Sequence, residues 1–384
     1  MKNNRDLPKN ILIAPCAYKG TFSPLELCQA IAFGIKRVFP AATAHYFPLA
    51  DGGDGTIESL HYLLEGELKA TKVLGPTDKM VDCRWLLTEY KDSKGKRALV
   101  ELASASGIAH LEGENLAPLL AHTRGCGQVI KECLNQGIKD VCLTVGGSAS
   151  TDGGTGILHE LGARFLDEQG RELKPCGKNL IKISFIDTDK LVKTLDGVSL
   201  TVLCDVNNPL FGEHGAAYVY GPQKGASPAI VEELDRGLRH FASVMEKTTG
   251  VNASGIPGAG AAGGVPFAMV SVQNSDSVKL VSGFEWFSDA TNLANAVEKS
   301  DLVIGAEGHL DSQSLQGKAI GELAHVCRQK KTPLWIIPAR AAAEVNWSDF
   351  GIEAVEESAQ SQRATLQDVE RAAATLCRKL KSVN

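Results

Sequence analysis

Four glycine-rich turns constrain the fold of this chain more strongly than any other feature of its sequence. They occupy residues 51–55, 146–154, 258–264 and 307–311. Glycine costs backbone entropy on folding, so such clusters are typical of places where the main chain takes a positive φ or passes close to another group. Phosphate is a frequent partner, because exposed turn amides can hold its oxygens and neighbouring carboxylates can hold Mg²⁺.

Four short apolar segments, each followed by a turn rich in Asp or Gly, predict buried strands. The segments cover residues 46–49, 141–145, 200–203 and 302–304. Continuous apolar runs of this length are typical of strands in a parallel sheet covered on both faces. Open α/β sheets bind their ligands at the carboxyl ends of their strands. The turns therefore predict a ligand site built on an α/β fold.

The first strand and helix show the clearest local signals. Residues 11–14 form an apolar strand and residues 15–22 the loop that follows it. Ser23, Pro24 and Glu26 then supply an N-cap, a proline at the first helical position and the acid of a capping box. This order predicts a strand, a loop and a helix in succession.

Two domains are expected, because 384 residues exceed the roughly 250–300 at which a single core stops growing. Short β segments at residues 81–87 and 98–102 follow one another without a long helix, which indicates an antiparallel insertion. Turn-rich sequence continues from residue 167 to about 283. We expect a discontinuous α/β domain at residues 1–70 and 284–384 and an inserted domain at residues 71–283. Residues 128–165 could belong to either domain.

Composition excludes several classes of protein. Acidic residues outnumber Lys and Arg by 45 to 40, which leaves a net charge of -5 and makes nucleic acid an unexpected partner. The ten cysteines form no Cys-x-x-Cys pair, and their scatter through apolar segments suits reduced thiols in a cytoplasmic protein. Residues 1–10 are polar, and no apolar run approaches the roughly 20 residues that span a bilayer, so neither a signal peptide nor a membrane partner is expected.

Two places in the sequence offer groups that could hold phosphate. Lys19 lies in the loop before the first helix, where it could reach a nucleotide or substrate phosphate; a solvated loop lysine is the alternative. The turn at 146–154 joins an apolar strand to a helix, so its amides collect at a helix N-terminus. It is neither a Walker A loop nor Gly-x-Gly-x-x-Gly, and a purely structural turn is the alternative. Its candidate nucleotide-binding residues are Gly146, Gly147, Ser148, Asp152, Gly153 and Gly154.

Carboxylates beside the turns could act on a hydroxyl or a metal. Asp51 and Asp54 could hold Mg²⁺ or the hydroxyls of a small polyol, although Asp54 could equally cap the following helix. Asp205 ends the strand at 200–203 and is a candidate base for a substrate hydroxyl; an Asx-turn before Pro209 is the alternative. Lys224 lies in a loop from which it could neutralise a substrate carboxylate or phosphate.

The last turn adds further acids. Glu307 and Asp311 could hold Mg²⁺, and Lys318 adds a cation before the next helix. His309 lies between the two acids, but a loop histidine is more often a bystander than an acid or a ligand.

Taken in order, these motifs resemble the glycerate kinase family of the type found in many bacteria, the type I or glycerate 2-kinase-like group. The matching stretches are Lys19-Gly20 after Ile13-Ala14-Pro15, residues 50–56, Gly146 to Ala149 with Asp152 to Gly154, Cys204 to Val206 with Asn208 to Leu210, residues 221–226, residues 257–264, and Glu307-Gly308 with residues 311–313 and 317–318. Seven ordered motifs between about residue 11 and residue 325 are far more specific than any one of them.

The resemblance implies ATP-dependent phosphorylation of D-glycerate, usually at the 2-hydroxyl, with Mg²⁺. It implies a flavodoxin-like parallel-sheet domain interrupted by a second, swivelling domain of β/β/α type, in a monomer or a homodimer. Catalytic roles are implied for Asp205, Lys19 and Asp51, and the Mg²⁺ role for Asp311. Nucleotide contacts also extend to Glu307 and Lys318, and substrate contacts to Asp54, Asn208, Lys224 and Gly260.

Several positions near the predicted ligand site depart from the family pattern. Cys16 and Ala17 stand where the family often has an acid and a hydroxyl, and His309 stands where an Arg is common. A neutral imidazole holds a phosphate less firmly than a guanidinium does. Two alternatives to a glycerate kinase therefore stay open: a catalytically silent homologue that binds nucleotide or glycerate, and a kinase for a related small hydroxy acid.

Overall fold

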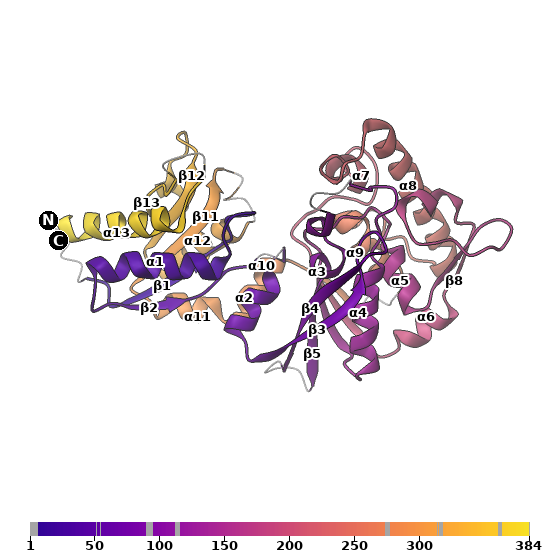
Figure 1. The fold of residues 1–384 in the computed structure, drawn as a ribbon, viewed down its shortest axis with the longest axis horizontal. Coiled ribbons are helices and arrows are strands. Elements are labelled where there is room, and N and C mark those ends of the chain that lie inside the picture. Colours follow the sequence, from indigo (N-terminus) through magenta and orange to yellow (C-terminus); the bar gives the residue numbers. More distant parts are fainter. Residues whose placement is uncertain are drawn as a thin grey trace. The chain divides into compact units, whose positions relative to one another are not determined.

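The computed structural model describes residues 7–50, 52–53, 55–89, 95–111, 116–272, 277–312, 314, 318–359 and 363–383. The α/β class predicted from the sequence is confirmed (Figure 1). The chain divides into two compact units. The first unit comprises Met1–Asp51, Glu58–Leu64 and Phe284–Asn384, and the second comprises Gly52–Ile57 and Glu65–Gly283.

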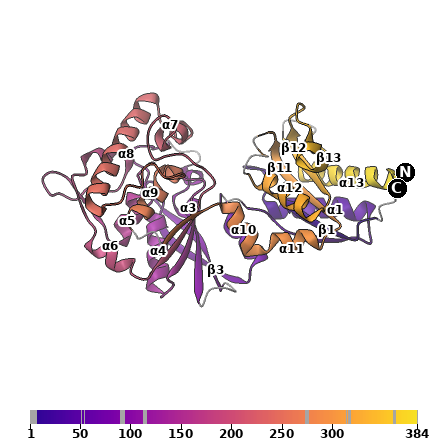
Figure 2. The same cartoon turned by 180° about the vertical axis from the view of Figure 1, so that it is seen from behind.

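The first unit is built on a five-stranded parallel sheet with the order β13-β12-β11-β1-β2. Its strands are β1 (Asn10–Pro15), β2 (Thr43–Tyr46), β11 (Leu302–Leu310), β12 (Leu334–Ala341) and β13 (Ile352–Val355). Helices α1 and α13 lie on one face and α11 and α12 on the other, as the two opposite views show (Figures 1 and 2). The helices are α1 (Pro24–Val38), α11 (Leu293–Glu298), α12 (Ala319–Lys330), α13 (Leu366–Val383) and the short η5 (Trp347–Phe350). Two more, α2 (Thr56–Leu63) and α10 (Gly283–Thr291), begin in residues of the second unit and continue in the first.

The start of α1 is the one that the sequence predicts. Ser23 Oγ accepts the amide of Glu26 at 3.3 Å, and Glu26 Oε2 accepts the amide of Ser23 at 2.8 Å, which completes the capping box. Further along α1, a Cβ on Gly34 would lie 2.7 Å from Ala373 Cβ. Glycine at this position therefore lets α1 and α13 pack closely.

Two strand boundaries in the first unit differ from the prediction. The strand expected at residues 46–49 lies earlier, at Thr43–Tyr46. The amides of Phe47 and Leu49 still donate to the carbonyls of Ile13 and Pro15, so the chain continues alongside β1 beyond the end of β2, and Pro48 lacks an N–H only on the outer edge of the sheet. The turn expected at 307–311 is mostly strand, because β11 continues beyond the end of β1 by pairing with β12 as far as Leu310.

The second unit contains a six-stranded mixed sheet with the order β10-β9-β6-β5-β4-β3. The four strands from β10 to β5 are parallel, and β5, β4 and β3 pair antiparallel. The predicted antiparallel segment is thereby confirmed. The strands are β3 (Gly66–Leu74), β4 (Met80–Glu89), β5 (Lys96–Glu101), β6 (Asp140–Thr144), β9 (Ser199–Leu203) and β10 (Val278–Val281), with a separate hairpin of β7 (Arg164–Leu166) and β8 (Phe185–Asp187).

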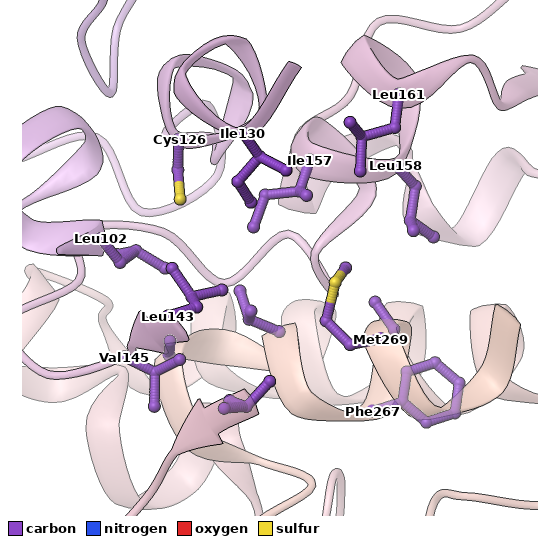
Figure 3. Packing of buried hydrophobic residues seen from close by; sticks show 14 of the residues in the cluster. Leu102, Cys126, Ile130, Leu143, Val145, Ile157, Leu158, Leu161, Phe267 and Met269 are labelled. Atoms are coloured by element: carbon purple, nitrogen blue, oxygen red, sulfur yellow. The ribbon is translucent and has the colours of Figure 1, made fainter. Parts of the chain in front are cut away.

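Helices of the second unit pack against this sheet around one hydrophobic core. Figure 3 shows side chains of α4, α5, α9 and β6 meeting in that core. The helices are α3 (Leu102–Ser106), α4 (Arg124–Asn135), α5 (Thr155–Leu161), α6 (Asp189–Thr194), α7 (Ala216–Tyr220), α8 (Pro228–Thr249) and α9 (Val265–Val272), with short turns η1 (Ile108–Leu111), η2 (Gly177–Lys182), η3 (Pro222–Lys224) and η4 (Ala261–Gly263). None of the helices in the described part of the chain has the length and apolar composition needed to cross a bilayer.

Candidate active site

In the second unit, the predicted turns meet at one edge of the sheet. Strands β5, β6, β9 and β10 are parallel neighbours, so their carboxyl ends share that edge. Helix α3 leaves it at residue 102, and loops leave it at residues 145, 204 and 282. Open α/β sheets bind ligands at such an edge. The candidate site of this unit is therefore built from these loops and the turns packed on them.

Gly146, the first glycine of the turn at 146–154, lies against Gly52 and Gly53 of the turn at 51–55, here called the acidic turn. The amide of Gly146 donates to the carbonyl of Gly52 at 3.3 Å. A Cβ on Gly146 would lie 2.6 Å from Gly53 Cα, so a larger residue would push the two turns apart. The carbonyl of Gly147, at φ +70, accepts the amide of Ile108. Part of the glycine content predicted to serve phosphate therefore serves backbone packing.

The turns at 146–154 and 258–264 also pack backbone to backbone. The amide of Gly153 donates to the carbonyl of Gly263 at 2.8 Å. A Cβ on Gly263 would lie 2.4 Å from the carbonyl oxygen of Ser150, and one on Gly154 would lie 2.6 Å from Ala268 Cβ. Gly153, Gly154 and Gly263 all have positive φ. Both reasons for glycine, conformation and close approach, therefore apply at this contact.

Asp152 is fully buried and holds the turn from within. Its Oδ2 accepts the amide of Thr123 at 2.9 Å, the hydroxyl of Thr123 at 2.8 Å and the amide of Gly156 at 3.1 Å. Its Oδ1 lies 3.3 Å from the amide of Gly154. This carboxylate ties the start of α5 to the start of α4 and has no exposed surface for a nucleotide.

Asp205, the predicted base, lies at the carboxyl end of β9. It is exposed and directly follows β9. Its Oδ1 accepts the hydroxyl of Ser282 at 2.7 Å and the amide of Gly283 at 2.8 Å, both just beyond β10. These hydrogen bonds hold the carboxylate at the loop edge of the sheet, and hydrogen bonds to an ionised carboxylate are among the stronger ones.

Asn208 and Gly260, both predicted to contact substrate, are engaged within the unit. The amide group of Asn208 donates to the carbonyl of His214 at 2.8 Å and accepts the hydroxyl of Tyr220 at 2.6 Å. Gly260 donates its amide to the carbonyl of Asn208, and a Cβ on Gly260 would lie 2.2 Å from the carbonyl oxygen of Pro209. These two residues shape the loop that follows Asp205.

Lys224, the third described residue with a predicted substrate contact, has its side chain in the interior. It is 3% exposed, and its Nζ donates to Ser148 Oγ at 2.8 Å and to the carbonyl of Ser150 at 2.5 Å. Burial lowers the pKa of this amine to about 8, against the raising effect of Asp152. The lysine therefore meets the turn at 146–154 from η3.

Glu101, at the end of β5, was not predicted as a site residue. It is 6% exposed, and its two carboxylate oxygens accept the amides of Gly55 and Ile57, each at 3.2 Å. It thereby caps the start of α2 and fixes the end of the acidic turn. The signal available in the sequence was an acid ending an apolar strand, the same arrangement that identified Asp205.

In the first unit, the loop after β1 brings Lys19 to the surface. The loop is anchored by Tyr18, which is 3% exposed and whose hydroxyl donates to the carbonyl of Ile337 at 2.7 Å. Burial raises the pKa of that hydroxyl well above its usual range. A Cβ on Gly308 would lie 3.6 Å from Tyr18 Cα, so this loop runs beside β11. Lys19 itself is exposed.

Glu307 and Asp311 lie where β11 ends. Glu307 Oε2 is inaccessible to solvent and has no hydrogen-bond partner among the described residues. Burial raises the pKa of Glu307 to about 7, although Lys318, Ser314 and Lys19 act in the opposite direction. Asp311 Oδ1 accepts the amide of Ser314 at 2.8 Å, and this hydrogen bond lowers the pKa of Asp311.

Lys318 and His309, also near the end of β11, are exposed to solvent. Lys318 is exposed at the N-cap of α12, and its side chain makes no capping hydrogen bond. His309 is exposed, with Nε2 4.0 Å from Asp311 Oδ2. Asp51 and Asp54 lie outside the described residues. Within the described part of the chain, no group of three or more His, Cys, Asp or Glu side chains is arranged to hold a metal ion.

Comparison with known proteins identifies the family of the chain. Residues 11–384 match the model of the glycerate kinase family. A glycerate kinase from Halalkalibacterium halodurans is 39% identical over 324 residues, which cover 84% of this chain and 83% of that protein. The glycerate 2-kinase of Escherichia coli is 37% identical over 346 residues, which cover 90% of this chain and 89% of that protein.

A solved structure gives the same result for the fold. A crystal structure from Salmonella typhimurium, described as a candidate glycerate kinase 2, superposes with a TM-score of 0.82 at 33% sequence identity. The superposition covers 97% of this chain and 98% of that one. Family model, relatives and structure thus each extend over most of the chain. The chain belongs to the glycerate kinase family.

Proposed function

We propose that this protein transfers the γ-phosphoryl group of ATP to the 2-hydroxyl of D-glycerate. The relatives named glycerate kinase, among them a glycerate 2-kinase, support the substrate class at 36–39% identity over most of their lengths. The observation that carries the proposal in this chain is the exposed Asp205 carboxylate, held at the edge of the sheet where the glycine-rich turns meet. A base beside turns with backbone amides that can hold phosphate suits phosphoryl transfer to an alcohol.

The proposed reaction uses Asp205 as the base that orients the acceptor. The glycerate hydroxyl oxygen forms a bond to the γ-phosphorus while the bond from that phosphorus to the β,γ-bridging oxygen breaks. ADP leaves with the electron pair of the broken bond, and the hydroxyl proton passes to the Asp205 carboxylate. Phosphoryl transfer depends mainly on positioning and charge neutralisation, so a firmly held carboxylate suits the task. Asp51 is a second proposed catalytic residue on the sequence resemblance.

Within the second unit, we assign phosphate of ATP to amides of the turn at 146–154; within the first unit, Lys19 and Lys318 are retained as candidate phosphate ligands on the family resemblance. Amides at a helix N-terminus favour anions, and the turn leads into α5. Lys19 and Lys318 are both exposed, which leaves their charges accessible to phosphate. Asp152 acts from within the turn, since its carboxylate is fully buried and bonded. Asp54 is retained as a substrate ligand on the resemblance alone.

The donor atoms at the end of β11 fit Mg²⁺. In kinase sites this ion is bound by one or two carboxylates together with substrate phosphates, and it keeps several waters. Glu307 offers an oxygen without a hydrogen-bond partner among the described residues, and Asp311 offers a second carboxylate that stays ionised because its pKa is lowered. These two residues would hold the ion, which would neutralise phosphate charge when bound.

We also propose a fold family for the first unit and a role for the second. Numbered within the first unit, the strand order β2-β1-β11-β12-β13 is 2-1-3-4-5, the order typical of flavodoxin-like domains. We take the first unit to be flavodoxin-like and the second to be the swivelling domain that the family resemblance implies.

Incubation with ATP, Mg²⁺ and D-glycerate, followed by phosphorus NMR, tests the function. We expect 2-phosphoglycerate and ADP in equal amounts, and a much slower reaction with L-glycerate. A product phosphorylated at the 3-hydroxyl would overturn the regiochemistry. Binding of ATP and D-glycerate by calorimetry without any product would overturn the kinase and leave a silent homologue.

A further inference from the structure

Lys224 carries its amine into the interior of the second unit. Lysine is almost never fully buried unless its charge has a partner, yet this side chain is 3% exposed. Its main chain is fixed locally, because its amide donates to the carbonyl of Gly221 and the next residue, Gly225, takes φ +86. A Cβ on Gly225 would lie 2.7 Å from Leu116 Cβ, so the backbone at this position has little room to move.

The amine reaches two groups of the same turn. Lys224 Nζ donates to Ser148 Oγ at 2.8 Å and to the carbonyl oxygen of Ser150 at 2.5 Å. Ser148 also pairs with Gly107 as an isolated β-bridge, and Ala149 donates its amide to the carbonyl of Ser106. The turn is therefore anchored in two ways. Lys224 anchors it through side-chain hydrogen bonds, and Ser106 and Gly107, after β5, anchor it through backbone contacts.

The ionic surroundings of Lys224 do not explain its position. Among the described residues it forms no ion pair, and the charged group that acts on it is Asp152. Both oxygens of that carboxylate accept hydrogen bonds from Thr123, Gly154 and Gly156. The contacts that Lys224 makes are thus hydrogen bonds to the turn. A neutral amine has two N–H groups, enough for both acceptors, so these contacts survive the loss of its proton.

We propose that Lys224 is a positioning residue that clamps the turn at 146–154 through Ser148 and Ser150, and that it makes no contact with glycerate. The inference rests on the proposed kinase function for its catalytic consequence and on geometry alone for the clamp. The turn supplies the amides assigned to ATP phosphate, so loosening it should weaken nucleotide use and leave the acceptor site intact.

Replacing Lys224 with Met keeps the length of the side chain and removes both donors. We expect the KM for ATP to rise at least tenfold, with the KM for D-glycerate within twofold of the original value. Backbone amides of residues 146–156 should exchange with deuterium at least tenfold faster. Lys131→Met, on the exposed side of α4, is the matched control and should change neither quantity.

A pH profile separates the clamp from a ligand role. If Lys224 bound the glycerate carboxylate, its charge would be lost above pH of about 8 and the KM for D-glycerate would rise about tenfold per pH unit. The clamp predicts no such rise up to pH 9, since the neutral amine keeps both hydrogen bonds. Ser148→Ala, which removes one acceptor, should reproduce part of the ATP effect.

Several results would overturn the proposal. A Lys224→Met protein with a raised KM for glycerate and an unchanged KM for ATP would assign the lysine to substrate, and unchanged deuterium exchange at 146–156 would remove the clamp. If Lys224→Met fails to fold, Lys224→Gln, which keeps two N–H donors on a shorter side chain, must show a smaller rise in the KM for ATP and no rise in the KM for D-glycerate. A wild-type protein without kinase activity would refute the proposed function, whereas the exchange experiment would still test the clamp.

Discussion

Replacing Glu307 with Gln should stabilise the protein above neutral pH, because the folded state buries an ionisable carboxyl there. Burial raises the pKa of Glu307 from 4.5 to about 7. Below pH 4.5 the group is protonated in the folded and unfolded states alike. Between 4.5 and about 7 the folded state binds the proton more tightly, so stability falls as the pH rises through this window. Above a pH of about 7, the full loss in the free energy of unfolding remains.

The magnitude follows from the same pKa values. At 1.36 kcal/mol for each pKa unit, the change from 4.5 to about 7 corresponds to about 3 kcal/mol. Solvent reaches part of the half-buried side chain and screens the effect, which leaves about 2 kcal/mol. Glutamine removes the charge and keeps the shape. For a domain of about 150–250 residues, 2 kcal/mol corresponds to a rise in Tm of about 4–8 °C.

Thermal unfolding of wild type and Glu307→Gln at pH 5 and pH 8 measures the effect. We expect the variant to melt several degrees higher at pH 8 and the difference to shrink at pH 5. Glu246→Gln, an exposed position on α8, is the matched control and should show no pH-dependent difference. An equal difference at both pH values, or a variant less stable at pH 8, would refute the assignment of a raised pKa to Glu307.

Three other substitutions test separate parts of the structure. Asp205→Asn should lower kcat at least a hundredfold while calorimetry shows unchanged ATP affinity; near-normal turnover would remove Asp205 from the base role. Glu101→Gln leaves the amide of Gly55 or Ile57 without an acceptor and should cost about 1–3 kcal/mol of stability in thermal unfolding, against no change in Glu246→Gln. Gly263→Ala, at φ +71 with its Cβ 2.4 Å from the carbonyl oxygen of Ser150, should cost more than about 2 kcal/mol, and a melting temperature equal to wild type would contradict the packing of the two turns.

Local signals in the sequence predicted the parts of the fold that depend on local chemistry. The capping box of Ser23 and Glu26 specifies the start of α1 without help from distant residues. The end of β11 depends instead on pairing with β12, which lies some thirty residues away in the chain, so the apolar run at 302–304 could not show that the strand continues to Leu310.

The long helix α8 was missed although its periodicity is present. Ser227 caps it and Pro228 starts it, and buried residues recur at Val231, Leu234 and Leu238. The proline and glycine turns on either side, at 221–222 and 257–258, indicated loop for the whole region. The helical spacing of three and four residues was the better evidence, since Pro at the first helical position starts a helix as readily as it interrupts one.

The sequence alone could not show whether a glycine cluster binds a ligand or packs against another segment, because both roles require glycine. A positive φ and a close approach are required whether the approaching group is a phosphate or another turn. In the second unit, a Cβ added to Gly146, Gly154 or Gly263 would lie 2.6 Å or less from an atom of another segment. The group that approaches the turn in the folded protein determines whether its glycines serve ligand binding or packing. The sequence of the turn alone does not identify that group.

The structure also distinguishes two acids for which the sequence predicted ligand roles, Asp205 as a base and Asp152 as a nucleotide contact. Asp152 and Asp205 both follow apolar strands, yet Asp152 is fully buried with both oxygens bonded, whereas Asp205 is exposed at the sheet edge. Asp152 and Lys224 then act on the turn at 146–154 from two sides, one from the starts of α4 and α5 and the other from η3. If the turn binds phosphate as proposed, it loses little freedom in doing so, and such positioning is the main contribution of a protein to phosphoryl transfer.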